Sequence, residues 1–352
     1  MLSPLRIALA VTCEKAVKTD PSAGLLPARH SFAGKIVAAK QTKCQLSFRF
    51  GVFMGVDLNG IQLLIEAQKR GVSFKRMASL GRQGLYVNRH ELISVLREAG
   101  YAMPQDCVRR LMDPTTKYAE DFFRLLGAKE IVAIDASDYE GAQIVHDMNR
   151  PVPDSLVSCF DVVLDGGTLE HVFDFATALR NAAQMVRPDG LLISYTMANN
   201  FCGHGFYQFS PELFYRFLCP KNGYSMERCI VWEDIPASRF YSVPDPESVQ
   251  SRIEFTSDTG TYMMVQAKRV GDVSRDFIPQ QSDYVRLWDE PAEAARAGSA
   301  IAKLKAALKR SRPLRSVVYA LRRLLRLEIR QQRMKRNARG FLTPLPNLRV
   351  IR

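Results

Sequence analysis

The sequence contains no long hydrophobic run and no closely paired cysteines. No apolar stretch reaches about 18 residues, the minimum for a membrane-spanning helix, so no transmembrane helix is expected. The seven cysteines are odd in number and scattered, without a Cys-x-x-Cys pair. This pattern predicts neither a disulfide framework nor a zinc site, and it favours reduced thiols in the cytoplasm. The opening residues lack the small-residue cleavage site of a signal peptide, so none is expected.

Acidic residues are scarce at both ends of the chain. Residues 1–53 carry a net charge of +6, and residues 296–352 carry +16 with Glu328 as the single acid. Because the whole chain has a net charge of +13, the residues between these ends carry −9. The high isoelectric point therefore results from the basic residues at the two ends, and any attraction to polyanions is expected at those ends.

The overall composition, 47% hydrophobic and 24% charged, is that of a globular protein. Residues 1–53 mix glycine, proline, serine and lysine without a hydrophobic period, so we expect a poorly ordered basic segment. Periodic signals begin at residue 54 and predict one domain over 54–272. A linker over 273–295 and a basic, amphipathic helical tail over 296–352 are expected to follow.

Apolar runs and helix signals alternate within this domain. Continuous apolar runs predict buried strands over 74–81, 129–135, 141–147, 159–167 and 191–196. Helices are predicted over 61–71, 90–100, 113–127, 174–186 and 211–218. Asn88, Asp113 and Asp174 are the expected N-caps of the second, third and fourth of them. Two more runs, 226–233 and 261–270, suit an antiparallel pair. This alternation indicates an α/β fold, a Rossmann-like and mostly parallel sheet with helices on both faces.

Polar side chains recur where successive predicted strands end. In an open parallel sheet, ligands bind at the carboxyl ends of the strands. Asp135 follows the second strand, and its carboxylate can accept both hydrogen bonds of a ribose diol. Asp147 follows the third strand and can accept a hydrogen bond from an adenine amino group. The alternative is that both acids only cap turns.

Several segments of this region resemble class I S-adenosylmethionine (SAM)-dependent methyltransferases. The string FDVVLDGGTLEHVFD, followed by a helix and VRPDGLLIS, is similar to the fourth- and fifth-strand segments of the small-molecule enzymes. VAIDASD and VHDMN resemble the second and third strand tips of that family. The resemblance covers roughly residues 75–272. It implies SAM as cofactor and a seven-stranded sheet with an antiparallel last strand.

The resemblance also implies which residues bind the cofactor. Asp135, with the adjacent Ala136, would hold the ribose, and Asp147, with Met148, would contact the adenine. The loop after the fourth strand would flank the methionine part and the sulfonium. Its implied cofactor residues are Asp165, Gly166, Gly167 and Leu169.

The first loop, LGRQG, departs from the family pattern. That loop is normally glycine-rich, which lets backbone N–H groups approach the cofactor. Here Asp135 follows Gly81 by 54 residues, whereas a tight unit has about 20. We interpret LGRQG as a variant loop in which Arg82 or Gln83, next to Gly81, replaces some of the backbone contacts.

The loop over residues 199–209 combines amides, glycines, a histidine and a tyrosine after the fifth strand. This composition suits a loop that faces the acceptor substrate, although a packed aromatic loop would have similar residues. His204 is a candidate general base because imidazole titrates near neutral pH. His171 and Tyr207 are the other candidate catalytic residues, and no metal site is expected.

The tail has an apolar stripe with arginines beside it. Its apolar members recur at helical spacing and are Leu314, Val318, Leu321, Leu325 and Ile329. The arginines follow one residue later, at Arg315, Arg322, Arg326 and Arg330. Such a helix suits an anionic membrane surface or an acidic partner. It also suits nucleic acid, or packing on its own enzyme.

Together these patterns predict a cytoplasmic enzyme that transfers a methyl group from SAM to an oxygen or nitrogen of a small-molecule or saccharide-like acceptor. A peripheral position at the membrane is the alternative that the tail offers. One alternative function is an RNA methyltransferase that uses the basic ends to hold phosphates. Another is a non-catalytic binding or scaffold protein with an altered cofactor loop.

Overall fold

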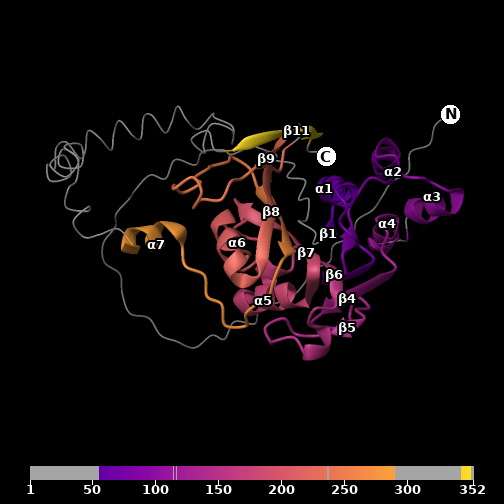
Figure 1. Ribbon diagram of the computed structural model, residues 1–352. Helices are drawn as coiled ribbons and strands as arrows, with labels where there is room; N and C mark the ends of the chain where they lie inside the picture. Colours follow the sequence, from indigo (N-terminus) through magenta and orange to yellow (C-terminus); the bar gives the residue numbers. More distant parts are fainter. Residues whose placement is uncertain (1–54, 114, 116, 236–237, 290–341, 350–352) are drawn as a thin grey trace, which may run out of the picture. The chain divides into compact units, whose positions relative to one another are not determined.

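The computed structural model describes residues 55–113, 115, 117–235, 238–289 and 342–349 (Figure 1). All of these belong to one compact unit, Gly51–Arg352. The predicted basic segment 1–53, and the arginine-flanked apolar stripe of the tail, lie outside the described residues. None of the described helices is long and apolar enough to cross a membrane.

One nine-stranded sheet organises the described part of the chain. Its order is β11-β9-β8-β10-β7-β6-β2-β4-β5. The strands are β2 (Arg76–Leu80), β4 (Glu130–Asp135), β5 (Ile144–Val145), β6 (Phe160–Gly166), β7 (Val186–Asn199), β8 (Tyr224–Glu233), β9 (Arg239–Ser242), β10 (Thr261–Arg269) and β11 (Thr343–Arg349). Strands β5, β4, β2, β6 and β7 pair in parallel. Strand β10 is antiparallel to both β7 and β8, which confirms the predicted antiparallel pair.

The predicted seven-stranded sheet is present but extended by two strands, β9 and β11. Strand β9 pairs antiparallel with β8, and β11 pairs antiparallel with β9. Residues 343–349 therefore form an edge strand, although the sequence analysis assigns them to a helical tail. Pro344 and Pro346 account for the difference, because proline is excluded from helix interiors but tolerated in an edge strand.

Seven helices and three short 3-10 turns surround the sheet in the described part of the chain. The helices are α1 (Leu58–Lys69), α2 (Arg89–Glu98), α3 (Gln105–Met112), α4 (Glu120–Leu125), α5 (Phe175–Met185), α6 (Pro211–Phe217) and α7 (Ser282–Asp289). The 3-10 turns are Asp154–Leu156, Leu169–His171 and Pro220–Asn222. A separate parallel pair, β1 (Gly55–Val56) and β3 (Gly84–Leu85), lies outside the main sheet.

Two of the three predicted N-caps are confirmed, and one is wrong. The Asn88 side chain accepts hydrogen bonds from backbone N–H groups in the first turn of α2. The Asp174 carboxylate accepts one from Thr177 N at the start of α5. Asp113 instead ends α3, and its carboxylate accepts from Thr115 N at 2.8 Å. An aspartate before proline suits such a turn as well as a helix start, so the predicted helix over 113–127 is reduced to α4.

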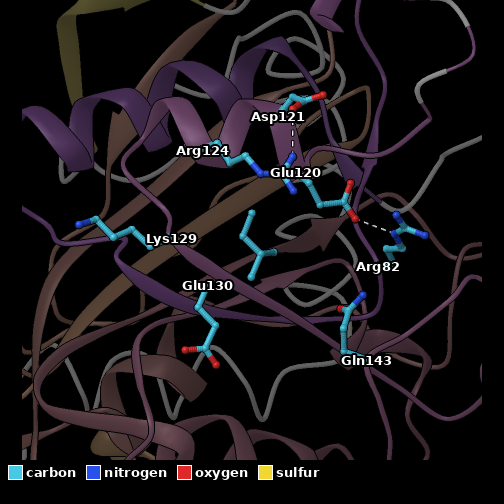
Figure 2. A pocket seen from close by; sticks show the side chains of 8 residues that line it. Arg82, Glu120, Asp121, Arg124, Lys129, Glu130 and Gln143 are labelled. Atoms are coloured by element: carbon cyan, nitrogen blue, oxygen red, sulfur yellow. Dashed lines mark hydrogen bonds and ion pairs between the residues drawn. The ribbon is translucent and has the colours of Figure 1, made fainter. Parts of the chain in front are cut away.

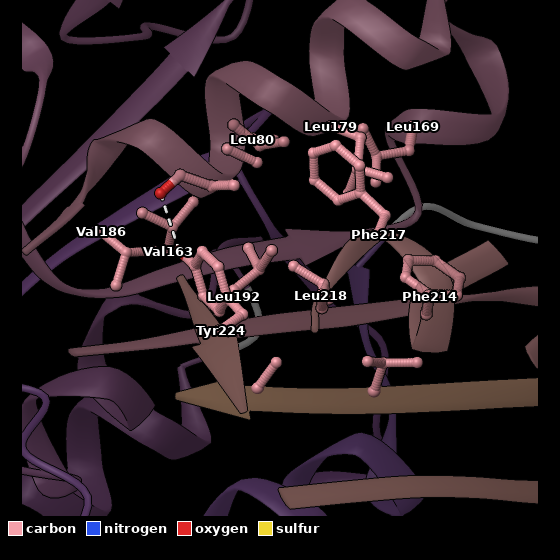
Figure 3. Close-up of a cluster of buried hydrophobic side chains, with 14 of the residues drawn as sticks. Leu80, Val163, Leu169, Leu179, Val186, Leu192, Phe214, Phe217, Leu218 and Tyr224 are labelled. Carbon is pink, nitrogen blue, oxygen red and sulfur yellow. Dashed lines mark hydrogen bonds between the residues drawn. The ribbon is translucent and has the colours of Figure 1, made fainter. Parts of the chain in front are cut away.

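Buried apolar side chains cover both faces of the sheet. On one face Leu80, Val163 and Leu192 pack with Leu179 of α5 and Phe214 of α6, as Figure 3 shows. A second cluster on the sheet collects Met77, Val162 and Ile193 with side chains of α1 and α4. Because neighbouring residues of β6 face opposite clusters, the strand is buried along its whole length, and its central residues are all apolar instead of alternating with polar ones. Burial of each such aliphatic or aromatic side chain stabilises the folded state by about 1.5–3 kcal/mol.

Candidate active site

The carboxyl ends of β2, β4 and β6 meet at one edge of the sheet. Gly81 follows β2 with φ +70°, a conformation that favours glycine. A Cβ atom there would lie 3.2 Å from Thr168 Oγ1 and 3.8 Å from Asp135 Oδ2. The Thr168 hydroxyl also donates to Leu80 O at 2.7 Å. The three strand ends that carry the predicted cofactor residues are thus neighbours in space.

Asp135 offers a free carboxylate at this edge. No described residue forms a hydrogen bond or an ion pair with its side chain. Its backbone carbonyl accepts from His146 N at 2.7 Å, which holds β4 beside the following segment. Ala136 is exposed in the turn immediately after it. The carboxylate is therefore available to a ligand with paired donors, such as a diol.

Asp147 and Met148 lie in the next turn and have different surroundings. Asp147 Oδ1 accepts from Asn149 N at 2.9 Å and Asn149 Nδ2 at 2.7 Å. These hydrogen bonds lower the pKa of the Asp147 carboxyl, so it is ionised at neutral pH. Met148 is buried in the hydrophobic cluster, and its carbonyl accepts from Asn181 Nδ2 at 3.2 Å.

Gln83 folds across the first loop. Its side chain is only 3% exposed, and Nε2 donates to Leu80 O at 2.7 Å. A Cβ atom on Gly166 would overlap with the Gln83 amide, so this close approach requires glycine at the end of β6. Gln83 Oε1 is buried and accepts no hydrogen bond from any described residue. The variant loop thus carries an unsatisfied acceptor between β2 and β6.

Arg82 is held by groups on α4 and on the segment after β4. Its Nε donates to Glu120 at 2.6 Å (Figure 2). Its Nη1 donates to Glu140 O at 2.9 Å. The guanidinium also stacks on Tyr118 at 3.8 Å. The Arg82 side chain lines a polar cavity of about 490 Å³ together with Asp121 and other charged residues. Because these contacts occupy the guanidinium, Arg82 fixes the loop and is not a free donor for the cofactor.

Asp165 shapes the loop that follows β6. Its side chain is fully buried and accepts from Thr168 N at 2.9 Å, Leu169 N at 3.2 Å and Ser194 Oγ at 2.6 Å. Burial raises the pKa of the Asp165 carboxyl. Gly167 turns the chain at φ +93°, and Leu169 is buried in the hydrophobic cluster. Asp165 is therefore a positioning residue for this loop.

The structure brings His171 and His204 together, 33 residues apart in the chain. Their Nε2 atoms are 3.1 Å apart, and the rings meet edge to face. Glu170 lies beneath them with its side chain 0% exposed. One of its oxygens accepts from Thr196 Oγ1 at 2.9 Å, and the other lies 4.0 Å from His204 Nε2 without a hydrogen-bond partner.

The pKa values of this cluster follow from its burial. Burial, and then the neighbouring Asp165, raise the pKa of Glu170 to about 8. Burial lowers the pKa of His171, and burial together with His171 lowers the pKa of His204. Both imidazoles are therefore neutral at pH 7, with lone pairs available to a proton or a metal ion. The three ligand atoms lie within 4.8 Å of one another, which brings together a set of metal-binding groups where the sequence analysis expects none.

Backbone contacts attach the loop after β7 to Glu170. Phe206 N donates to Glu170 O at 2.8 Å, and Tyr207 N donates to the same oxygen at 3.2 Å. A Cβ atom on Gly205 would lie 2.8 Å from Glu170 O, so glycine permits the close approach. The Tyr207 hydroxyl donates to Phe173 O at 2.7 Å, which directs it to a backbone carbonyl and not to the histidine pair.

Glu170 is the site residue that sequence reasoning missed. It stands inside the quoted LEHV string, between a buried leucine and a candidate histidine. Nothing in the local spacing distinguishes a buried carboxyl from an exposed helix-start acid. Only the packing of the loop after β7 on Glu170 brings its carboxyl within 4.8 Å of both histidine nitrogens.

Comparisons with known proteins agree with this architecture. Residues 115–194 match the methyltransferase domain family. This stretch runs from the segment before α4 into β7 and includes Asp135, Asp147 and His171. No curated protein matches the chain.

Three solved structures illustrate the range of similar proteins. The 1,6-didemethyltoxoflavin-N1-methyltransferase of Burkholderia thailandensis is 12% identical, with 60% of this chain and 78% of that chain covered and a TM-score of 0.31. The branched-chain polyamine synthase of Thermus thermophilus is 13% identical, with 63% and 58% covered and a TM-score of 0.33. A SAM-dependent methyltransferase of Thermotoga maritima is 15% identical, with 59% and 89% covered and a TM-score of 0.31.

Residues 115–194 therefore carry a methyltransferase domain, and they lie in a sheet whose strand ends hold the predicted cofactor residues. This domain indicates an enzyme that transfers one-carbon groups.

Proposed function

We propose that the enzyme methylates an oxygen or nitrogen atom of a small-molecule or saccharide-like acceptor. The observation that carries this proposal is the cluster of Glu170 and His171, in the 3-10 turn after β6, with His204 from the loop after β7. Two neutral imidazoles and a carboxyl can contact a polar hydroxyl or amine, and an aliphatic carbon acceptor would gain nothing from them.

The residues at the strand ends fit SAM. Asp135 has an unused carboxylate for the ribose diol, and Asp147 is ionised and can accept from the adenine amino group. The acceptor atom Gln83 Oε1 is buried and unsatisfied, so a donor such as the amino group of SAM would complete its hydrogen bonding. Gly81 adds no side chain beside Asp135, and Gly166 leaves room for the Gln83 amide. Arg82, which is engaged by Glu120, is assigned a supporting role for the loop.

The protein groups need to supply alignment more than covalent chemistry. When bound, SAM supplies a methyl group on a sulfonium that needs no further activation. Asp165 fixes the loop from Gly166 to Leu169, so the cofactor edge and the histidine cluster are held at a set separation. Holding two reactants in line can provide much of the rate of such a transfer.

Titration calorimetry with SAM and S-adenosylhomocysteine tests the cofactor side. Asp135→Ala should weaken binding by about 1.5–3 kcal/mol, roughly 10- to 150-fold, because hydrogen bonds to a charged group are lost. Asp138→Ala is the matched control, since Asp138 is an exposed carboxylate in the same turn. Equal SAM affinity in folded Asp135→Ala and wild-type protein would contradict the assignment of Asp135 to the ribose.

Transfer of labelled methyl groups tests the acceptor class. The full chain is incubated with methyl-labelled SAM and, separately, a metabolite extract or total RNA. Label in low-molecular-weight products supports the proposal, and label only in RNA would replace it with the nucleic-acid alternative. The residues on which the RNA and membrane alternatives depend, at the two basic ends, lie outside the described residues apart from 342–349.

A further inference from the structure

We propose that Glu170, His171 and His204 bind a divalent transition-metal ion on the acceptor side of the site. The catalytic use of this ion rests on the proposed function, whereas its binding can be tested without any methyl transfer.

The distances between the ligand atoms suit one ion. Two atoms that bind the same ion at about 2.1 Å lie roughly 3–4 Å from each other. His171 Nε2 and His204 Nε2 are 3.1 Å apart, and His204 Nε2 is 4.0 Å from Glu170 Oε1. All three ligand atoms lie within 4.8 Å of one another. Small side-chain movements are enough to place an ion between them.

The two buried acids at this point suit a cation. Glu170 and Asp165 are both 0% exposed, and no lysine or arginine among the described residues forms an ion pair with either. A buried carboxylate without a positive partner is costly, so such a group either holds a proton or binds a cation, and an unsatisfied buried oxygen is rare. Glu170 Oε1 is such an oxygen, and it faces His204. A divalent cation would satisfy it.

The surroundings orient the ligands as metal sites require. Thr196 Oγ1 donates to the other Glu170 oxygen at 2.9 Å, which leaves Oε1 directed at the histidines. Backbone N–H groups of Phe206 and Tyr207 attach the His204 loop to Glu170 O. Contacts of this kind fix the direction of metal ligands and raise affinity.

The donor set indicates the kind of metal. Two imidazole nitrogens and one carboxylate oxygen favour Zn²⁺, Co²⁺, Fe²⁺ or Mn²⁺ over Ca²⁺ or Mg²⁺, which prefer oxygen ligands. Three protein ligands leave coordination positions open, as in catalytic sites. A cavity of about 410 Å³ is lined by residues 200–204, so His204 borders a space that an acceptor could enter.

The ion would act as a Lewis acid toward the acceptor. An acceptor hydroxyl or amine bound to it becomes more acidic and releases its proton to water. The freed electron pair then forms the bond to the methyl carbon as the carbon–sulfur bond breaks, and that bond's electrons stay on sulfur. The products are the methylated acceptor and S-adenosylhomocysteine. His204 is then a metal ligand, in place of the general base that the sequence suggests.

Cobalt titration of the tag-free full chain, stripped with a chelator, tests metal binding directly. The visible absorption of Co²⁺ should change with one ion per chain, and Zn²⁺ should displace it. Glu170→Gln and His204→Ala should each weaken Co²⁺ binding by at least about 100-fold, because loss of a ligand exceeds the 10- to 100-fold cost of losing its support. Circular dichroism verifies that each variant is folded.

Two control variants separate this site from other metal-binding groups. His90→Ala removes a histidine on α2, outside the cluster, and Cys202→Ser removes an exposed thiol two residues before His204. Neither should change Co²⁺ affinity. No change in absorption with folded wild-type protein, or equal affinity in Glu170→Gln, His204→Ala and wild type, would overturn the proposal.

The same samples distinguish failure of the metal site from failure of the proposed function. SAM binding and methyl transfer without Co²⁺ binding would remove the metal site and keep the methyl acceptor proposal. One Co²⁺ per chain, lost in both ligand variants, supports the metal site even where no tested small molecule is methylated.

Discussion

Gln83 lies in the first loop, which has fewer glycines than the resemblance implies, and its buried amide lies against Gly166, the last residue of β6. Here the Gln83 amide is tied to Leu80 O and leaves one acceptor oxygen unsatisfied. Gly166 makes room for it, since any Cβ there would overlap with the amide. The two residues therefore depend on each other.

Gly166→Ala should destabilise the protein by about 1–3 kcal/mol, because an added methyl group overpacks a filled space. Urea denaturation measures the free energy of unfolding. Gly203→Ala is the control, since a Cβ at that position would meet nothing within 4 Å. Equal stabilities of the two variants would show that Gln83 can move aside at little cost.

Strands with continuous apolar runs could be predicted from the sequence. Short strands that form only by pairing with a neighbouring strand could not. Strand β6 is buried along its whole length and β2 at every residue after the first, so their composition alone marks them. Strand β9 has four residues and depends on its pairing with β8, which local sequence does not encode. The prediction that Asp113 starts a helix is wrong, because aspartate is common both at helix N-caps and in turns and local sequence does not separate the two.

The site shows the same division. The strand-end acids Asp135 and Asp147 were predictable, since sheet topology brings strand ends together. Both histidines were found by residue type, but their 3.1 Å approach depends on how the loop after β7 folds back. Glu170 was missed because burial, and not spacing, makes it distinctive.

Helix α5 begins four residues after His171, and Asp174 caps its first turn. The carboxylate accepts from Thr177 N at 3.1 Å and Thr177 Oγ1 at 2.7 Å. Asp174→Ala should lower the free energy of unfolding by about 0.5–2 kcal/mol, the usual cost of an N-cap. Asp174→Asn should retain most of the stability, because asparagine caps equally well. Thermal and urea unfolding compare the variants, and an equal loss in both would show that charge matters more than capping.

The whole molecule joins an acidic body to a basic C-terminal region that returns to the sheet. Residues 296–352 carry +16 against −9 for the body, so contacts with polyanions should depend on them. The same region ends in β11, and Leu342 beside it is 5% exposed within the hydrophobic cluster. Removing the tail therefore removes part of the core as well as the charge.

Truncation after Asp289 should leave a folded domain that binds SAM, because every proposed cofactor residue precedes that point. Its free energy of unfolding should fall by about 1.5–3 kcal/mol through loss of the buried Leu342. Leu342→Ala in the full chain is the control that alters packing without changing charge. If the tail binds an anionic membrane surface, vesicles with anionic lipid should bind the full chain and Leu342→Ala but not the truncated chain, and neutral vesicles should bind none. Equal binding of truncated and full chains to anionic vesicles would place the contact on the body. RNA binding that falls with salt, with a log–log slope of about −0.7 for each phosphate neutralised on a single strand, would instead assign the tail to nucleic acid.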